Sequence, residues 1–99
     1  MRVRTPLVYP DGGVVDVFVL EHDGEVGVTD LGEALGRLRM QSVDAGRSAE
    51  QTRRVEDTCQ TLGVALHRGQ LVLRVGPDTM IAEAVLRVGQ AAVRLSDPN

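Results

Sequence analysis

The stretch that decides the fold is residues 81–95, which read IAEAVLRVGQAAVRL. Its spacing predicts a helix from Pro77 or Asp78 to Leu95, because apolar residues three and four apart fall on one side of a helix. Two neighbouring apolar stripes result, the first made of Ile81, Ala84, Val85, Val88, Ala92 and Leu95, and the second of Ala82, Leu86, Gly89 and Val93. A helix this apolar around its axis needs protein on more than one side.

Two explanations for the second stripe stay open. The helix is either the centre of a core that wraps around it, or it uses the stripe to associate with a second copy of the chain. Small residues such as Gly89 allow a neighbouring backbone to approach closely. On the second explanation we expect a homodimer whose contact residues are Ala82, Leu86, Gly89 and Val93.

Two tight turns precede this helix. Asp23-Gly24 lies between two β-branched runs, and a type I′ turn needs positive φ at both central residues, which Asp-Gly tolerates. Arg68-Gly69 lies between residues 64–66 and 71–73, which alternate well enough for strands. Each pair predicts a β-hairpin.

Two further helices fit between the hairpins. Leu31, Ala34, Leu35 and Leu38 form one stripe, with Asp30 as N-cap and Glu33 as its capping-box partner. Met40 to Gly46 is expected to be a loop. The second helix is expected to start at Ser48 and to end at Gly63 in the left-handed conformation. The fold class is therefore α+β, with two antiparallel hairpins and three helices in the order β-β-α-α-β-β-α.

Size and composition predict a single domain over residues 1–99, cytoplasmic and not attached to a membrane. The chain has 99 residues, 42% of them hydrophobic and 25% charged, as in ordinary globular domains. Its first residues lack the apolar core of a signal peptide, and no apolar run approaches the roughly 20 residues of a membrane span. All eleven basic residues are arginine, which excludes P-loop and Schiff-base lysine chemistry.

Charge is divided unevenly along the chain. Residues 5–36 hold seven acids and no arginine, whereas residues 37–75 hold seven arginines and four acids. The arginine-bearing half offers Arg47, Arg53 and Arg54 as residues that would bind a partner. Either half is a possible docking surface. With two aromatic residues in the whole chain, a stacking platform for single-stranded nucleic acid is not expected.

No complete catalytic set is visible in the sequence. His22 and His67 lie near the turns without metal-ligand spacing, and Cys59 falls on the apolar side of the second helix, where we expect it to be buried. Asp16, Asp30 and Glu33 would converge if the strands pair as predicted. Such an acidic cluster is what a divalent cation or an acid-dependent hydrolase would require. No cofactor and no metal are expected.

Four stretches of the chain carry a family resemblance. They are Thr5-Pro6-Leu7 with Val14–Val19, Val28–Gly32, Leu62–Leu66 and Gly89–Asp97. In these stretches the chain resembles the bacterial and phage family catalogued as domain of unknown function 1828. The chain departs from that family at Asp11-Gly12-Gly13, and at Leu31, where the family's turn has a second Asp.

The resemblance implies a small accessory protein of bacteria, phages or other mobile elements, with a role around host defence or its inhibition. It implies no established activity, and the missing second Asp argues further against an enzyme. Together with the residues, it favours a non-enzymatic interaction or regulatory module that acts through protein–protein contacts. The alternative is a nucleic-acid-associated regulator or nuclease accessory that uses the arginine-bearing helical face.

Overall fold

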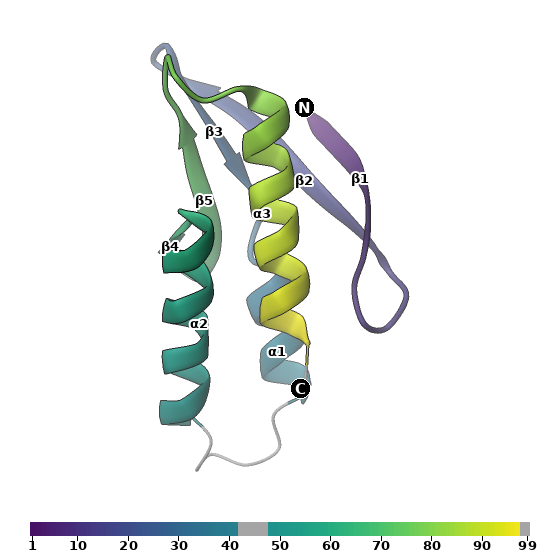
Figure 1. Ribbon diagram of the computed structural model, residues 1–99. Coiled ribbons are helices and arrows are strands. Elements are labelled where there is room, and N and C mark those ends of the chain that lie inside the picture. The colour runs from purple at the N-terminus through teal and green to yellow at the C-terminus, as the bar shows by residue number, and fades with distance from the viewer. Residues whose placement is uncertain (42–47, 98–99) are drawn as a thin grey trace.

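A five-stranded antiparallel sheet and three helices form the computed structural model, which describes residues 1–41 and 48–97 (Figure 1). The elements follow one another as β1 (Arg2–Val8), β2 (Val14–His22), β3 (Glu25–Thr29), α1 (Glu33–Gln41), α2 (Ser48–Leu62), β4 (Ala65–His67), β5 (Gln70–Val75) and α3 (Ile81–Ser96). In space the strands lie in the order β1-β2-β3-β5-β4. The predicted α+β class is confirmed, and the structure adds β1 before the two predicted hairpins.

Both predicted hairpins are present. Asp23 and Gly24 have φ angles of 53° and 78°, and Arg68 and Gly69 have φ angles of 52° and 80°. Positive φ at both central residues is the requirement of a type I′ turn, whose twist matches that of the flanking strands. The hairpins join β2 to β3 and β4 to β5, and β3 and β5 pair to complete the sheet.

The additional strand β1 is an edge strand with an irregular register. Between the pairs Arg4–Asp16 and Val8–Val14, β1 contains four steps where β2 contains two. The hydroxyl of Thr5 stabilises this bulge, since it donates to the Val15 carbonyl at 2.8 Å and accepts from the Leu7 N–H at 3.1 Å. A bulge at an edge also accommodates a proline, which has no N–H for the ladder.

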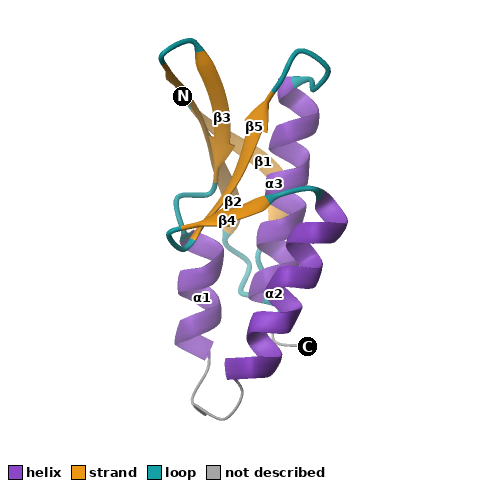
Figure 2. Cartoon of the chain, turned by 90° about the vertical axis from the view of Figure 1, so that its left-hand side faces the viewer, coloured by secondary structure: helices purple, strands orange, loops and turns teal. Residues whose placement is uncertain are grey.

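Helix α3 is the centre of the core. It lies across one face of the sheet, and its C-terminal half packs against α1 and α2 (Figures 1 and 2). The strands place beneath it a set of fully buried side chains, namely Val15, Val17, Val28 and Leu71. Gly89 faces β1, where an added Cβ would lie 2.8 Å from Leu7 Cδ1. The missing side chain therefore lets the bulge of β1 approach the helix.

The helix boundaries differ from the predicted ones at two N-termini. α3 begins at Ile81 rather than at Pro77 or Asp78, because the chain makes a turn first, in which the Thr79 N–H donates to the Gly76 carbonyl. α1 begins at Glu33, with Leu31 outside it. α2 begins at Ser48 as expected, and Gly63 ends it with φ +67°. The loop expected from Met40 to Gly46 is wrong at its start, because Met40 and Gln41 still belong to α1, and its remaining residues lie outside the described ones.

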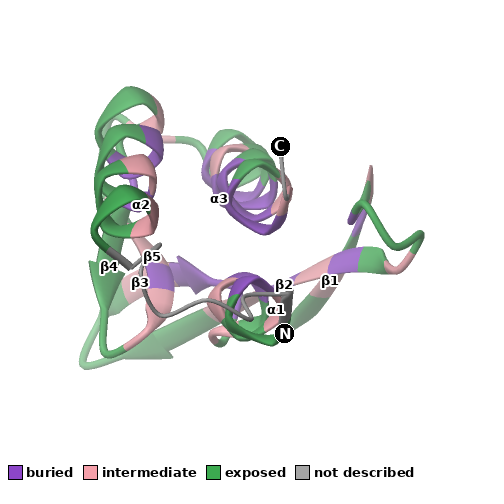
Figure 3. Cartoon of the chain, turned by 90° about the horizontal axis from the view of Figure 1, so that it is seen from below, coloured by how far each residue is buried: buried purple, intermediate pink, exposed green. Residues whose placement is uncertain are grey.

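The sheet face opposite α3 stays uncovered over part of its area. Figure 3 shows α2 and α3 on one side of the sheet. On the other side, Leu20 is 49% exposed and pairs with Gly27, while Phe18 and Val72 are half-buried. We call these four residues the open face.

Within residues 1–41 and 48–97 no helix combines the length and apolarity that crossing a membrane requires.

Candidate functional site

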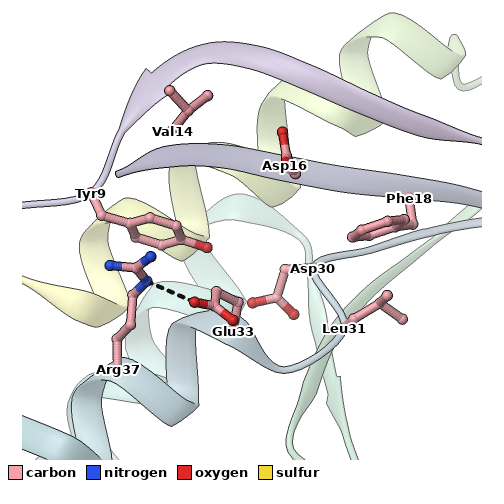
Figure 4. Close-up of a pocket in the computed structure, with 8 residues that line it drawn as sticks. All are labelled: Tyr9, Val14, Asp16, Phe18, Asp30, Leu31, Glu33 and Arg37. Atoms are coloured by element: carbon pink, nitrogen blue, oxygen red, sulfur yellow. Dashed lines mark hydrogen bonds and ion pairs between the residues drawn. The ribbon is translucent and has the colours of Figure 1, made fainter. Parts of the chain in front are cut away.

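A cavity of about 370 Å³ lies beside the open face, between the start of β2 and the start of α1 (Figure 4). β2 contributes alternate residues that point away from α3, and α1 contributes two residues one turn apart. The lining residues are Tyr9, Val14, Asp16, Phe18, Asp30, Leu31, Glu33 and Arg37. We call this cavity the acidic pocket, since three carboxylates and one guanidinium line it.

Tyr9 forms one wall of the acidic pocket. The residue is only 2% exposed, and its hydroxyl has no hydrogen-bond partner among the described residues. Figure 4 shows that hydroxyl pointing toward Asp30 and Glu33. Burial raises the pKa of Tyr9 above its usual range, and the neighbouring Asp30 carboxylate raises it further. The hydroxyl therefore stays protonated at neutral pH.

Arg37 holds Tyr9 in place. Its guanidinium lies over the ring, 3.9 Å from the centroid, in a cation–π contact. It also pairs with Glu33 at 3.1 Å, one helical turn away, and with Asp11 in the β1–β2 connection. The Gly13 N–H and this guanidinium hold the pKa of Asp11 below its usual range. The charge of Arg37 is thus already balanced by two acids.

Asp30 is a buried carboxylate with three backbone donors. Its Oδ1 accepts from Gly32 at 2.9 Å and from Leu71 on β5 at 3.1 Å, and its Oδ2 accepts from Ala34 at 3.0 Å. The side chain caps α1, as predicted, but from a position before the turn at Gly32. It also ties that helix to β5. The expected capping-box bond to the Glu33 side chain is not among the described contacts, because the Asp30 N–H donates to the Leu71 carbonyl at 3.4 Å and the Glu33 carboxylate pairs with Arg37.

Asp16 is the second orphaned group of the acidic pocket. Its Oδ1 is buried without a hydrogen-bond partner in the described chain, although the Arg4 Nε lies 3.5 Å away at a distance typical of a loose ion pair. The sequence predicted that Asp16, Asp30 and Glu33 would converge, and the structure brings all three to this pocket. Across residues 1–41 and 48–97, no group of three or more His, Cys, Asp or Glu residues is arranged to hold a metal ion.

The comparisons with known proteins assign a family. The family described as Domain of unknown function DUF1828 matches residues 5–95. The chain belongs to this family. No curated protein and no solved structure matches the chain.

The turn after β3 has an unusual backbone conformation. Leu31 has φ +57° and Gly32 φ +84°, so two successive residues adopt the left-handed conformation. Asp is one of the few residues other than glycine that tolerates this conformation, whereas leucine is strained there. Leu31 is also 49% exposed, so the turn leaves an apolar side chain at the pocket rim.

Of the three arginines expected to bind a partner, the structure describes Arg53 and Arg54, which have different surroundings. Arg53 is exposed on α2. Arg54, by contrast, donates to the Arg94 carbonyl at 3.1 Å and to the Asp97 carbonyl, so it stabilises the C-terminus of α3. Arg47 lies outside the described residues.

The four residues expected to mediate self-association divide along α3. Gly89 is buried against β1 and Val93 is half-buried, so the chain itself covers this part of the second stripe. Ala82 and Leu86 are exposed, Leu86 by 44%. The predicted burial of Cys59 is confirmed at 8% exposed, and burial raises the pKa of its thiol.

Proposed function

We propose that the protein is a small non-enzymatic module that binds another protein through the open face and the rim of the acidic pocket. The observation that carries this proposal is a set of exposed apolar side chains on the outward side of β2 and at the pocket rim. Leu20 is 49% exposed, Val14 41% and Leu31 49%. Exposed apolar side chains on one side of a sheet are a feature of interaction sites, and the strained Leu31 backbone beside them is the type of feature found at functional sites.

Charge favours a protein partner over nucleic acid or a lipid surface. Three arginines lie on this side of the sheet: Arg4 is beside Asp16 at 3.5 Å and Arg74 beside Glu25 at 3.7 Å, while Arg2, which pairs with Phe18, is exposed. The acidic pocket adds carboxylates that repel phosphate groups. A basic protein surface with apolar side chains is complementary to this arrangement. The setting suggested by the family resemblance, mobile elements and phage defence, is part of the proposal.

The nucleic-acid alternative requires an arginine cluster on α2. This alternative has weaker support, because Arg54 already donates to carbonyls at the end of α3. Of the two neighbouring arginines, Arg53 is the exposed one. A gel shift that weakens with salt and with Arg53→Glu would favour this alternative over a protein partner.

A substitution on the open face tests the main proposal. Leu20→Glu places a charge on the open face, and the exposed position predicts a change in unfolding free energy within about 0.5 kcal/mol. We expect affinity purification from the native host to recover a defined partner with the unmodified chain, and at least about tenfold less of it with Leu20→Glu.

Met40→Glu is the matched control, since Met40 is 87% exposed at the end of α1, away from the open face. Equal loss of partner with both variants, or recovery unaffected by Leu20→Glu, would contradict docking on the open face.

We also propose that the chain forms a homodimer through the exposed part of the second stripe, Ala82 and Leu86. Two small or apolar exposed residues one turn apart on a helix support a helix-to-helix contact. Light scattering at high micromolar concentration is expected to give a dimer, and Leu86→Glu a folded monomer. A monomeric mass for the unmodified chain would refute the dimer.

A further inference from the structure

The acidic pocket contains two buried polar groups without a hydrogen-bond partner in the described chain, and such groups point to a ligand. Buried polar groups in proteins are almost always hydrogen-bonded, because an unsatisfied one costs about 1–3 kcal/mol. The Tyr9 hydroxyl and the Asp16 Oδ1 are both buried without a hydrogen-bond partner in the described chain. Both residues line the same cavity. An occupant with hydrogen-bond donors would satisfy them.

The charges of the pocket select a cation. Asp16, Asp30 and Glu33 line it against Arg37, whose guanidinium is paired with Glu33 and with Asp11. Burial is the main reason that the pKa of Tyr9 is raised, and the carboxylates of Asp30, Glu33 and Asp16 raise it further while Arg37 opposes them. An anion would be repelled from this position.

The apolar lining residues of the pocket favour a cation that is carried by an alkyl chain. Val14, Phe18 and Leu31 contribute the apolar part of the wall, at the border with the open face. Arginine and lysine side chains combine a charged head that donates hydrogen bonds with an alkyl stem that packs on apolar surface. A bare metal ion would leave this part of the wall without a contact.

We propose that the acidic pocket binds the side chain of an arginine or lysine on the partner protein, with its cationic head between Asp16 and Tyr9 and its stem against Phe18 and Leu31. This inference rests on the proposed function, because it names the chemistry of the partner at the edge of the open face. The partner's cation displaces Arg4 as the nearest positive charge to Asp16. Arg4 is exposed and makes no hydrogen bond to that carboxylate, so little is lost in the exchange.

A titration followed by the amide signals of the isotope-labelled full chain tests the pocket directly. The probe is N-acetyl-arginine amide, and its neutral isostere N-acetyl-citrulline amide is the control ligand. We expect the arginine probe to shift the amides of residues 16, 18, 31 and 33 to saturation, with the citrulline probe at least about tenfold weaker. Equal binding of the two probes, or no binding of either, would overturn the proposal.

Variants of the two orphaned groups sharpen this test. Asp16→Asn is expected to weaken the arginine probe about tenfold, and Tyr9→Phe about fivefold, because each removes one acceptor. Glu21→Gln is the matched control, since it removes the same charge from an exposed position of β2 outside the pocket and should leave binding within about twofold. Tyr9→Phe retains the stacked ring and should not lower the melting temperature. If Glu21→Gln weakens binding as much as Asp16→Asn does, the attraction is non-specific and the proposal fails.

Two further experiments are needed. The first distinguishes a side chain of the partner from a free amine, and the second distinguishes the pocket proposal from docking on the open face. Agmatine binding while the capped arginine does not bind would assign the pocket to a free amine and contradict a side chain of a partner. If Leu20→Glu abolishes recovery of the partner while Asp16→Asn and Tyr9→Phe leave it unchanged, docking on the open face stands and the arginine pocket falls. If all three substitutions reduce recovery, both proposals are supported.

Discussion

Replacing Asp30 by alanine is expected to lower the free energy of unfolding by about 3 kcal/mol. The side chain is 1% exposed, and its two oxygens accept from the N–H groups of Gly32, Ala34 and Leu71. Alanine would leave those donors buried without a partner and remove the negative charge from the N-terminus of α1. Small domains have only about 5–15 kcal/mol of stability, so the loss is a large fraction of the total.

Urea denaturation monitored by circular dichroism measures this effect. Asp11→Ala provides the comparison, because that carboxylate is exposed and its removal should change stability by less than about 0.5 kcal/mol. Asp30→Asn should fall between the two, since its Oδ1 still accepts while its amide nitrogen faces a donor. A loss below about 1 kcal/mol for Asp30→Ala would show that this carboxylate does not join α1 to β5.

Replacing Val88 by glutamate is expected to unfold the chain. Val88 is fully buried at the middle of α3, between the sheet and the other helices. A carboxylate there is without a cationic partner, and its burial costs about 5 kcal/mol or more. Leu86→Glu, two residues earlier but 44% exposed, should retain the helical signal and cooperative unfolding. Val88→Glu with a melting temperature near that of the unmodified chain would contradict the position of α3 at the centre of the core.

The hairpins and the core stripe of α3 were predictable because their signals are local. Asp-Gly and Arg-Gly pairs determine the turns through φ, and helical spacing determines which side of α3 is buried. The second stripe was ambiguous, since its spacing is the same whether β1 or another molecule covers it. Gly89 shows that β1 covers part of it.

Strand β1 was not predicted for a physical reason. Its inward residues Val3, Thr5 and Leu7 do alternate with exposed ones, but Pro6 interrupts the pattern and arginines occupy two outward positions. At the bulge, the Thr5 hydroxyl makes hydrogen bonds in place of those between the two backbones. The alternation of apolar and polar residues does not indicate such bonds. The start of α3 was misplaced because Met80 provides no side-chain cap there.

The candidate site was predictable only in part. The convergence of Asp16, Asp30 and Glu33 follows from pairing the strands, and the structure confirms it. The roles of Tyr9 and Arg37 depend on a cation–π contact between residues 28 positions apart, for which the sequence offers no local signal. The orphaned hydroxyl, which gives the pocket its chemistry, becomes visible only when the surrounding contacts are known.

The same architecture explains why the two faces of the sheet differ. Helix α3 covers one face and buries Val15, Val17 and Val28. Leu20 points to the opposite face, which α3 does not cover, and is therefore exposed. The exposed face adjoins a pocket with unsatisfied polar groups. A stable core on one side therefore leaves apolar side chains of the other side exposed.

Hydrogen–deuterium exchange of the chain, free and in the complex recovered from its native host, tests binding at this exposed side most directly. We expect exchange to slow on complex formation in residues 14–22 and 29–33, with α3 unchanged. Slower exchange confined to α2 or α3, with β2 unaffected, would contradict the account.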